Sequence, residues 1–241
     1  TRFARVLDFQ TLGLQEDYRL GHEFFFRIYP LAKAFGSSRD VLGIYAGASY
    51  TVPLGDGLAR GFVQSVTEAE TSTLTDGLIA AGGEIVTPRL GIGRLVYDAQ
   101  VASRYRNYLN TQVFLGGNTR LRGYPSNFFV GKDIVTSNLE FRSRPLEILH
   151  TLEVGAVAFY DAGDAADGFS NLHAVQSVGG GFRALFPQLD RFVFRADVGF
   201  PVGDGARLPG VAPWSFFLAF EQAFALPTMT RGTVPSGAQE L

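Results

Sequence analysis

The sequence contains no cysteine and little charge. Of its 241 residues 18% are charged, and 21 basic against 23 acidic residues give a net charge of −2. The absence of cysteine excludes a disulfide framework, a thiolate metal site and a cysteine nucleophile. Nucleic-acid-binding surfaces carry a clustered basic excess, so the charge balance argues against that class of protein. Residues 1–25 lack the basic start, apolar middle and cleavage site of a signal peptide, so any export signal is expected to have been removed.

A long hydrophobic run is also missing. A spanning helix needs about 18 or more consecutive apolar residues. The longest uncharged stretches, such as residues 41–55, are shorter and are interrupted by Gly, Ser, Thr and Pro. The sequence therefore predicts no transmembrane helix. Its 29 glycines and 22 phenylalanines indicate a folded chain rather than a disordered one.

The strongest positive signal is an alternation of apolar and polar side chains with a period of two, which is typical of strands. Residues 191–201, for example, place phenylalanines on one face and Arg195 and Asp197 on the other. No comparable window carries a helical apolar stripe, so we expect an all-β fold with almost no helix. Eleven strands are predicted, at residues 3–13, 18–30, 41–52, 58–68, 77–87, 91–106, 133–145, 149–161, 174–187, 191–201 and 214–224.

One predicted strand, at residues 18–30, illustrates how the two faces are assigned. Its alternation sets Arg19, Glu23 and Arg27 against an apolar face. We therefore expect these three charged residues to share one side of the sheet.

The predicted connections alternate between short and long. The short ones lie near residues 14–17, 53–57, 88–90, 146–148 and 188–190, and the long ones near 31–40, 69–76, 107–132, 162–173 and 202–213. This sorting is typical of outer-membrane barrels, whose periplasmic turns are short and whose extracellular loops are long. We therefore predict an antiparallel up-and-down transmembrane β-barrel with its charged face toward the lumen. The alternative is a soluble barrel or sandwich with the phenylalanine-rich face inward, and alternation alone does not separate the two.

The longest predicted loop, residues 107–132, contains the sequence LGGNTRLRGY at residues 115–124. A glycine pair, a short spacer and an Arg-Gly-aromatic sequence resemble the loop signature of the outer-membrane assembly and translocation barrels. That superfamily includes the BamA- and TamA-type insertases, the two-partner secretion transporters and the bacterial surface antigens. Further segments resemble the family's later strands in the same order, at residues 138–142, 158–163, 178–187, 195–201 and 216–224.

The resemblance implies that a loop arginine is held inside the barrel by carboxylates of neighbouring strands. On this chain Arg122 is the implied latch, and Glu140 and Asp161 are its implied partners. A guanidinium group suits paired carboxylates better than an ammonium does. The alternative is that the motif is only a polar loop end and that both carboxylates are solvated. The other predicted site residues are Gly116, Gly117, Gly123 and Tyr124 of the loop, Arg142, Arg183, Arg195 and Asp197 facing the lumen, and Phe216, Phe220 and Phe224 of the closing strand.

The function implied by the resemblance is to insert or translocate polypeptides across the bacterial outer membrane, without catalytic residues, metal or cofactor. The implied partners are outer-membrane lipids, an unfolded polypeptide, and periplasmic modules or accessory lipoproteins. Two alternatives stay open. The barrel could anchor an upstream lipase-like or phosphoesterase domain and serve as its exit port, or it could be a passive pore.

The expected organisation is one barrel domain over residues 1–224, followed by a flexible tail over residues 225–241, which are rich in Pro, Gly, Ser and Thr. A single-chain barrel with both ends in the periplasm has an even number of strands, but eleven are counted. Family barrels have about 16 strands, so we expect the C-terminal part of a larger barrel, with 11 to 12 strands present and about five before Thr1.

Overall fold

The structure is a computed structural model that describes residues 2–70, 73–118, 120–148, 150–188, 192–220 and 222–223. Its strands are β1 (Arg2–Leu7), β2 (Gln15–Leu31), β3 (Val41–Leu54), β4 (Gly57–Glu70), β5 (Thr73–Val86), β6 (Gly93–Asn107), β7 (Val113–Leu115), β8 (Phe129–Gly131), β9 (Asp133–Ser143), β10 (Leu146–Ile148), β11 (Leu152–Ala166), β12 (Val175–Leu185), β13 (Phe194–Val202) and β14 (Ser215–Phe220). Helix in these ranges is confined to three short 3₁₀ segments, η1 (Lys33–Phe35), η2 (Phe169–Asn171) and η3 (Gly203–Arg207). No helix within the described ranges has the length and apolar character needed to cross a bilayer.

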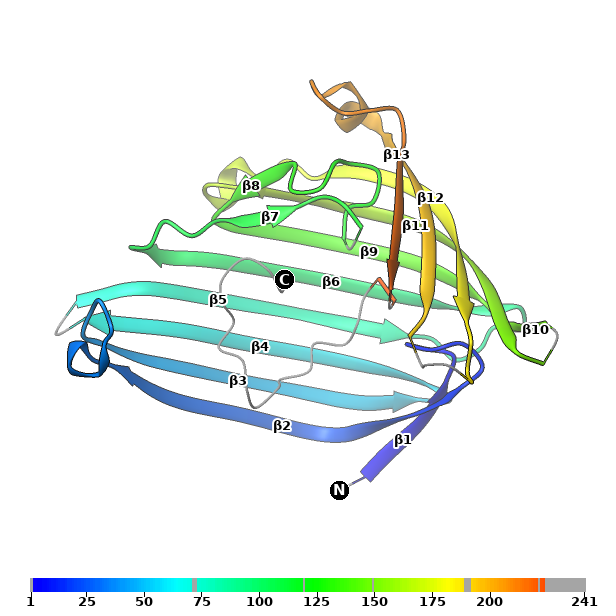
Figure 1. The fold of residues 1–241 in the computed structure, drawn as a ribbon, viewed down its shortest axis with the longest axis horizontal. Coiled ribbons are helices and arrows are strands. Elements are labelled where there is room, and N and C mark those ends of the chain that lie inside the picture. The colour runs from blue at the N-terminus through cyan, green and yellow to red at the C-terminus, as the bar shows by residue number, and fades with distance from the viewer. Residues whose placement is uncertain are drawn as a thin grey trace.

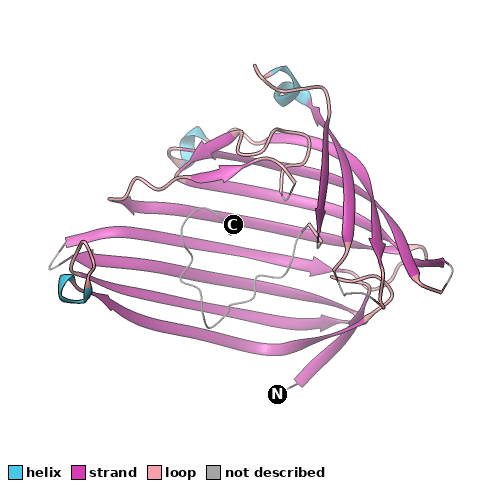
Figure 2. Cartoon of the chain, in the orientation of Figure 1, coloured by secondary structure: helices cyan, strands magenta, loops and turns pink. Residues whose placement is uncertain are grey.

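One antiparallel sheet contains all the long strands, as Figures 1 and 2 show. Its order is β1-β2-β3-β4-β5-β6-β9-β11-β12-β13-β14, with β10 added beside β11, while β7 and β8 pair only with each other. The eleven strands of this path correspond to the eleven predicted segments. The prediction of an all-β, antiparallel, up-and-down arrangement is therefore confirmed.

The sheet is curved but open. Among the described residues no ladder joins β14 to β1 or β2, so the closure expected of a barrel is not present in this chain. Closure requires the first and last strands to pair. Here β1 pairs only with residues 15–20 of β2, and β2 pairs with β3 through residues 21–31. Residues 21–31 of β2 are therefore not paired with β1 along the edge opposite β3.

The alternation along β2 is interrupted at Gly21, which has a φ of 92°. This left-handed backbone conformation is readily adopted only by glycine. Before it Arg19 is exposed, whereas Glu23 and Arg27 after it are partly buried. The prediction that these three charges share one face is wrong, because the irregular backbone at Gly21 shifts the alternation by one residue.

The predicted long connection at residues 69–76 is also wrong. β4 continues to Glu70 and β5 begins at Thr73, and these two residues pair. Polar side chains can continue a ladder beyond the end of the apolar pattern, because the backbone supplies its hydrogen bonds. The sorting into short and long connections is consequently weaker than predicted. It depends mainly on the stretch between β6 and β9, which contains β7 and β8.

The two faces of the sheet differ in chemistry. The face that lies inside the curve is charged and is covered by the connection between β6 and β9, which touches strands from β6 to β14. The outer face carries large apolar side chains that are exposed. Among them are Phe24, Ile28, Leu42, Val63, Leu139, Tyr160, Phe182, Phe194 and Leu218, all at least 36% exposed.

Three small apolar clusters are buried among the described residues, and two of them show how the inner face is covered. One packs the β6–β9 connection against the sheet through Leu121 and Tyr124. The other surrounds Phe9, which lies in the turn between β1 and β2. These clusters fix the connection and the turn against the charged face.

Candidate functional site: a buried arginine cluster

The β6–β9 connection is held over the inner face by a two-stranded hairpin. β7 and β8 pair from Val113↔Gly131 to Leu115↔Phe129. Residues 116–128, of which Thr119 lies outside the described part, form the tip of this hairpin and carry the predicted motif. In Figure 1 the hairpin lies alongside β9 and β11. The pairing of β7 and β8 therefore delivers the motif to the charged face of the sheet.

Glycines allow the tip to approach the sheet closely. Gly123 has a φ of 129°, and a Cβ built on it would lie 2.7 Å from the Cβ of Ser177 on β12. A Cβ on Gly199 of β13 would lie 2.5 Å from the carbonyl oxygen of Arg122. Gly116 and Gly117 also have positive φ angles, of 115° and 97°. Any side chain at Gly123 or Gly199 would therefore push the tip away from the strands.

Arg122 is fully buried at the centre of the site. Its Nε and Nη2 donate to Oδ2 and Oδ1 of Asp161, each at 2.9 Å, and its backbone N–H donates to the same Oδ2 at 3.0 Å. Its Nη1 donates to Glu140 and lies 3.6 Å from Oδ2 of Asp197. The structure thus brings the three residues of the implied latch together, and it adds Asp197 as a third carboxylate.

The carboxylates also bind the other predicted arginines. Arg142 donates through Nε to Glu140 at 2.7 Å, and Arg183 and Arg195 both donate to Asp197. These side chains are all nearly inaccessible to solvent. Four arginines and three carboxylates therefore form one buried cluster that joins the loop to β9, β11, β12 and β13.

The cluster keeps Arg122 charged. Burial by itself lowers the pKa of the guanidinium group, but Glu140, Asp161 and Asp197 raise it above its ordinary value. A group that never loses its proton cannot serve as an acid or a base in catalysis. The chemistry of Arg122 is therefore to hold negative charge in place.

The aromatic ring of Phe159 also contacts the Arg122 side chain. The guanidinium carbon lies 3.6 Å from the centre of the Phe159 ring, a cation–π contact. Phe159 is an apolar residue on the charged face, and Gly179 opposite it on β12 has no side chain to displace its ring. Sequence reasoning missed Phe159 as a site residue, although the alternation of β11 places it on the same face as Asp161.

Tyr124 fixes the far side of the tip. Its hydroxyl donates to the carbonyl of Gln176 at 2.8 Å, and its buried ring contacts Phe128 and Phe129. Burial raises the pKa of this hydroxyl to about 12, so it stays a donor. Tyr124 therefore attaches the tip to β12 independently of the ion pairs.

A second arginine of the loop was not predicted. Arg120 forms an ion pair with Asp98 of β6, and its carbonyl accepts a hydrogen bond from the Asn138 side chain of β9. The alternation of β6 indicates that Asp98 faces inward, but no sequence signal shows that Arg120 reaches it. Arg120 and Arg122 together attach the tip to strands from β6 to β13 on the inner face.

The predicted closing-strand aromatics lie apart from this cluster. Phe216 and Phe220 of β14 point outward and are exposed, and the ring of Phe220 contacts that of Phe194 edge-on with centroids 6.0 Å apart. Phe224 and residues 225–241 lie outside the described residues. Within the described ranges no group of three His, Asp or Glu side chains is arranged to hold a metal ion.

Comparison with known proteins gives no relative: no protein-family model and no curated protein matches the chain. Function is therefore inferred from the geometry of the sheet and of its loop.

Proposed function

We propose that this chain forms part of the wall of a bacterial outer-membrane β-barrel that inserts or translocates polypeptides. The observation that carries the proposal is the distribution of side chains on the sheet. Charged residues are buried inside the curve, and large apolar residues are exposed outside it. This is the pattern of a membrane barrel, with an apolar band toward lipid and a polar lumen.

The soluble alternative fits this distribution poorly. A sandwich buries its apolar faces against a second sheet, but the apolar side chains of the outer face here are exposed along strands from β2 to β14. Soluble monomers rarely expose continuous apolar patches larger than about a few hundred Å². Lipid removes this cost, because the hydrocarbon covers the outer face while the ladders satisfy the backbone.

The loop inside the curve favours translocation over a passive pore. A pore needs an open lumen, whereas here the tip at residues 116–128 is attached to β6 and β11 on the inner face through Arg120 and Arg122. A buried ion cluster gives a defined position rather than maximal stability, because the desolvation of its charges opposes their attraction. A tip held in this way can regulate access to the lumen without covalent chemistry.

The partners of the proposed activity follow from the same architecture. Outer-membrane lipids cover the outer face, and an unfolded polypeptide is the substrate. Among the described residues no ladder runs along the edge of β2 after Gly21 opposite β3, and such an edge can accept a further strand through backbone hydrogen bonds. Periplasmic modules or accessory lipoproteins are proposed to deliver the polypeptide.

The test is a transport assay in proteoliposomes that contain the protein. An unfolded outer-membrane protein is added outside, followed by a protease. We expect part of the substrate to become protected, and we expect Arg122→Ala to reduce this protection. Arg106→Ala is the matched control, because Arg106 is exposed at the end of β6. Ion conductance without protection of the substrate would contradict translocation and leave a passive pore. Insertion of the protein into the membrane without conductance or protection of the substrate would favour the alternative that the barrel is a membrane anchor.

A further inference from the structure

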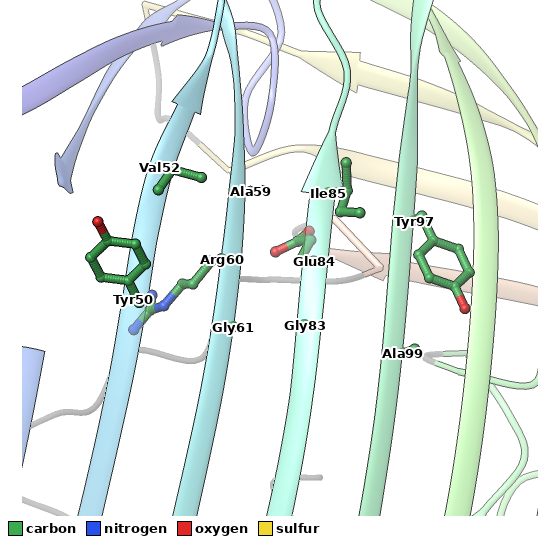
Figure 3. A pocket seen from close by; sticks show the side chains of 10 residues that line it. All are labelled: Tyr50, Val52, Ala59, Arg60, Gly61, Gly83, Glu84, Ile85, Tyr97 and Ala99. Carbon is green, nitrogen blue, oxygen red and sulfur yellow. The ribbon is translucent and has the colours of Figure 1, made fainter. Parts of the chain in front are cut away.

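The outer face contains a hollow of about 430 Å³ across strands β3 to β6. Tyr50 of β3 forms one wall, and Ile85 of β5 and Tyr97 of β6 form the other walls, as Figure 3 shows. The floor lies at Gly61 of β4 and Gly83 of β5. The three wall side chains are each at least 40% exposed, so the hollow opens to the surroundings of the sheet.

The register of the strands creates the hollow. Tyr50, Gly61, Gly83 and Ala99 are successive cross-strand partners, so two adjacent strands contribute no side chain between the tyrosines. A Cβ built on Gly61 would meet only the carbonyl oxygen of Gly82, at 3.9 Å. Neighbouring strands lie about 4.8 Å apart, so the strands of the two tyrosines are roughly 14 Å apart.

The lining selects an apolar occupant. The backbone groups of the floor belong to the strand ladders. The charged neighbours of the glycines turn to the inner face, where Arg60 binds Ser49 and Glu84 is buried. The hydroxyl of Tyr97 is engaged by Ser137 at 3.1 Å. A polar ligand would lose much of its hydration against this mainly apolar lining, whereas a hydrocarbon chain has no hydration to lose.

The position of the hollow fits a lipid whose head lies at the nearer end of the strands. Gly61 is four residues from the start of β4, roughly 13 Å along the strand. At that end the exposed Arg144 lies in the connection that follows β9, whereas Arg89, after β5, is paired with Asp56. A guanidinium group binds phosphate well. A phosphate near Arg144 would place its acyl chain over the floor of the hollow.

We propose that the hollow is a binding site for one acyl chain of a phospholipid, an inference that rests on the membrane location proposed above. The walls hold the acyl chain along a fixed path over β4 and β5. The lipids that cover the rest of the outer face are mobile by comparison. The ligand is recognised by its shape and apolar surface through Tyr50, Tyr97 and the glycine floor, and by its phosphate at the strand ends.

The experiment uses a phospholipid with a diazirine in one acyl chain, reconstituted with the protein and activated by light. We expect adducts to concentrate on peptides of β3 and β6 that contain Tyr50 and Tyr97. Gly61→Leu, which fills the hollow without a backbone clash, should reduce these adducts several-fold. Ala158→Leu is the control, because Ala158 is exposed on the outer face of β11 and does not line the hollow.

Equal labelling of Tyr50 and Tyr97 peptides in wild type and Gly61→Leu would overturn the lipid site. Disulfide-linked dimers of Tyr97→Cys, in a chain that has no other cysteine, would overturn it in favour of a second copy on this face. If spin labels on the outer face prove accessible to water, the membrane location fails and this inference fails with it. If those labels face lipid but the adducts do not respond to Gly61→Leu, only this inference fails.

Discussion

At the scale of single residues, Arg122 decides where the loop lies. Its side-on contact with Asp161 uses two guanidinium nitrogens and two carboxylate oxygens, and its remaining nitrogen serves Glu140. Lysine has a single ammonium group and cannot reproduce this fork. The guanidinium also lies on the Phe159 ring, so its removal takes the ion pair from Asp161 and uncovers the ring, while Glu140 keeps Arg142.

Replacement of Arg122 by alanine is expected to destabilise the protein by about 3–5 kcal/mol, because it strands buried carboxylates. Arg122→Lys should lose less, since the charge remains. The free energy of unfolding in urea, followed in detergent or lipid, checks both values. Arg106→Ala should leave stability within about 0.5 kcal/mol of wild type, as is usual for exposed sites. Equal stabilities of the Arg122→Ala and Arg106→Ala variants would contradict the latch.

At the scale of elements, the turn between β1 and β2 is organised by one carboxylate. Glu16 accepts hydrogen bonds from the backbone N–H groups of Phe9, Gln10 and Thr11, and from the hydroxyl of Thr11. It is largely buried, and Phe9 beside it fills an apolar cluster under the sheet. The turn is therefore folded into the inner face rather than free in solvent.

Glu16→Gln is expected to loosen this turn at a cost of about 1–3 kcal/mol, because an amide has one acceptor oxygen in place of two. Hydrogen exchange should then accelerate at residues 9–11 and stay unchanged in β9. Asp17→Asn is the control, since Asp17 is exposed on the same strand. Unchanged exchange at residues 9–11 in Glu16→Gln would show that the carboxylate does not organise the turn.

A second element, the turn between β3 and β4, carries a pH-dependent contact. Arg89 donates to Asp56 through Nε at 2.8 Å and lowers the pKa of that carboxyl below its ordinary value. Because the folded pKa is below the unfolded one, the contribution to stability is present above about pH 4 and is lost as the pH falls through the folded pKa.

Asp56→Asn should therefore reduce stability slightly at pH 7 and make a smaller difference as the pH falls through the folded pKa of Asp56, because wild type then loses the same contact. The pair is partly exposed, so the effect is expected to weaken in high salt. Unfolding free energies at pH 7 and in acid, each at two salt concentrations, measure it. A difference between the variants that is as large in acid as at pH 7 would contradict the assignment to this carboxyl.

The elements also show what local sequence can and cannot predict. The period of two locates the eleven main strands, because it reflects the two faces of a half-buried strand. It fails at Gly21, where one backbone angle shifts the phase, and at residues 69–76, where pairing continues beyond the apolar pattern. Both failures involve the backbone, which composition and alternation do not encode.

Within the site, the contacts between the loop and distant strands were the hardest to predict. The resemblance of the loop motif implies Arg122 with Glu140 and Asp161, and these residues are in contact. The pair of Arg120 with Asp98 depends on how deeply the tip enters the curve. That depth is set by the β7–β8 hairpin and by Gly199, neither of which follows from the motif.

At the scale of the whole molecule, the sheet has its apolar side outside and its charges inside. This arrangement is costly in water, because exposed apolar surface costs about 25 cal/mol per Å². In a bilayer the same surface is solvated by hydrocarbon, and the charged face is available to line a lumen. The membrane proposal therefore depends on which face meets lipid.

Site-directed spin labelling of two neighbouring residues of β4 tests this claim most directly. Val63 is exposed on the outer face, and Gln64 accepts a hydrogen bond from Tyr45 on the inner face. The chain has no native cysteine, so each variant, Val63→Cys or Gln64→Cys, carries one label. We predict that in membranes the label at Val63 is accessible to oxygen but not to a water-soluble nickel complex, and that the label at Gln64 shows the reverse. Access of the nickel complex to the label at Val63 would contradict it.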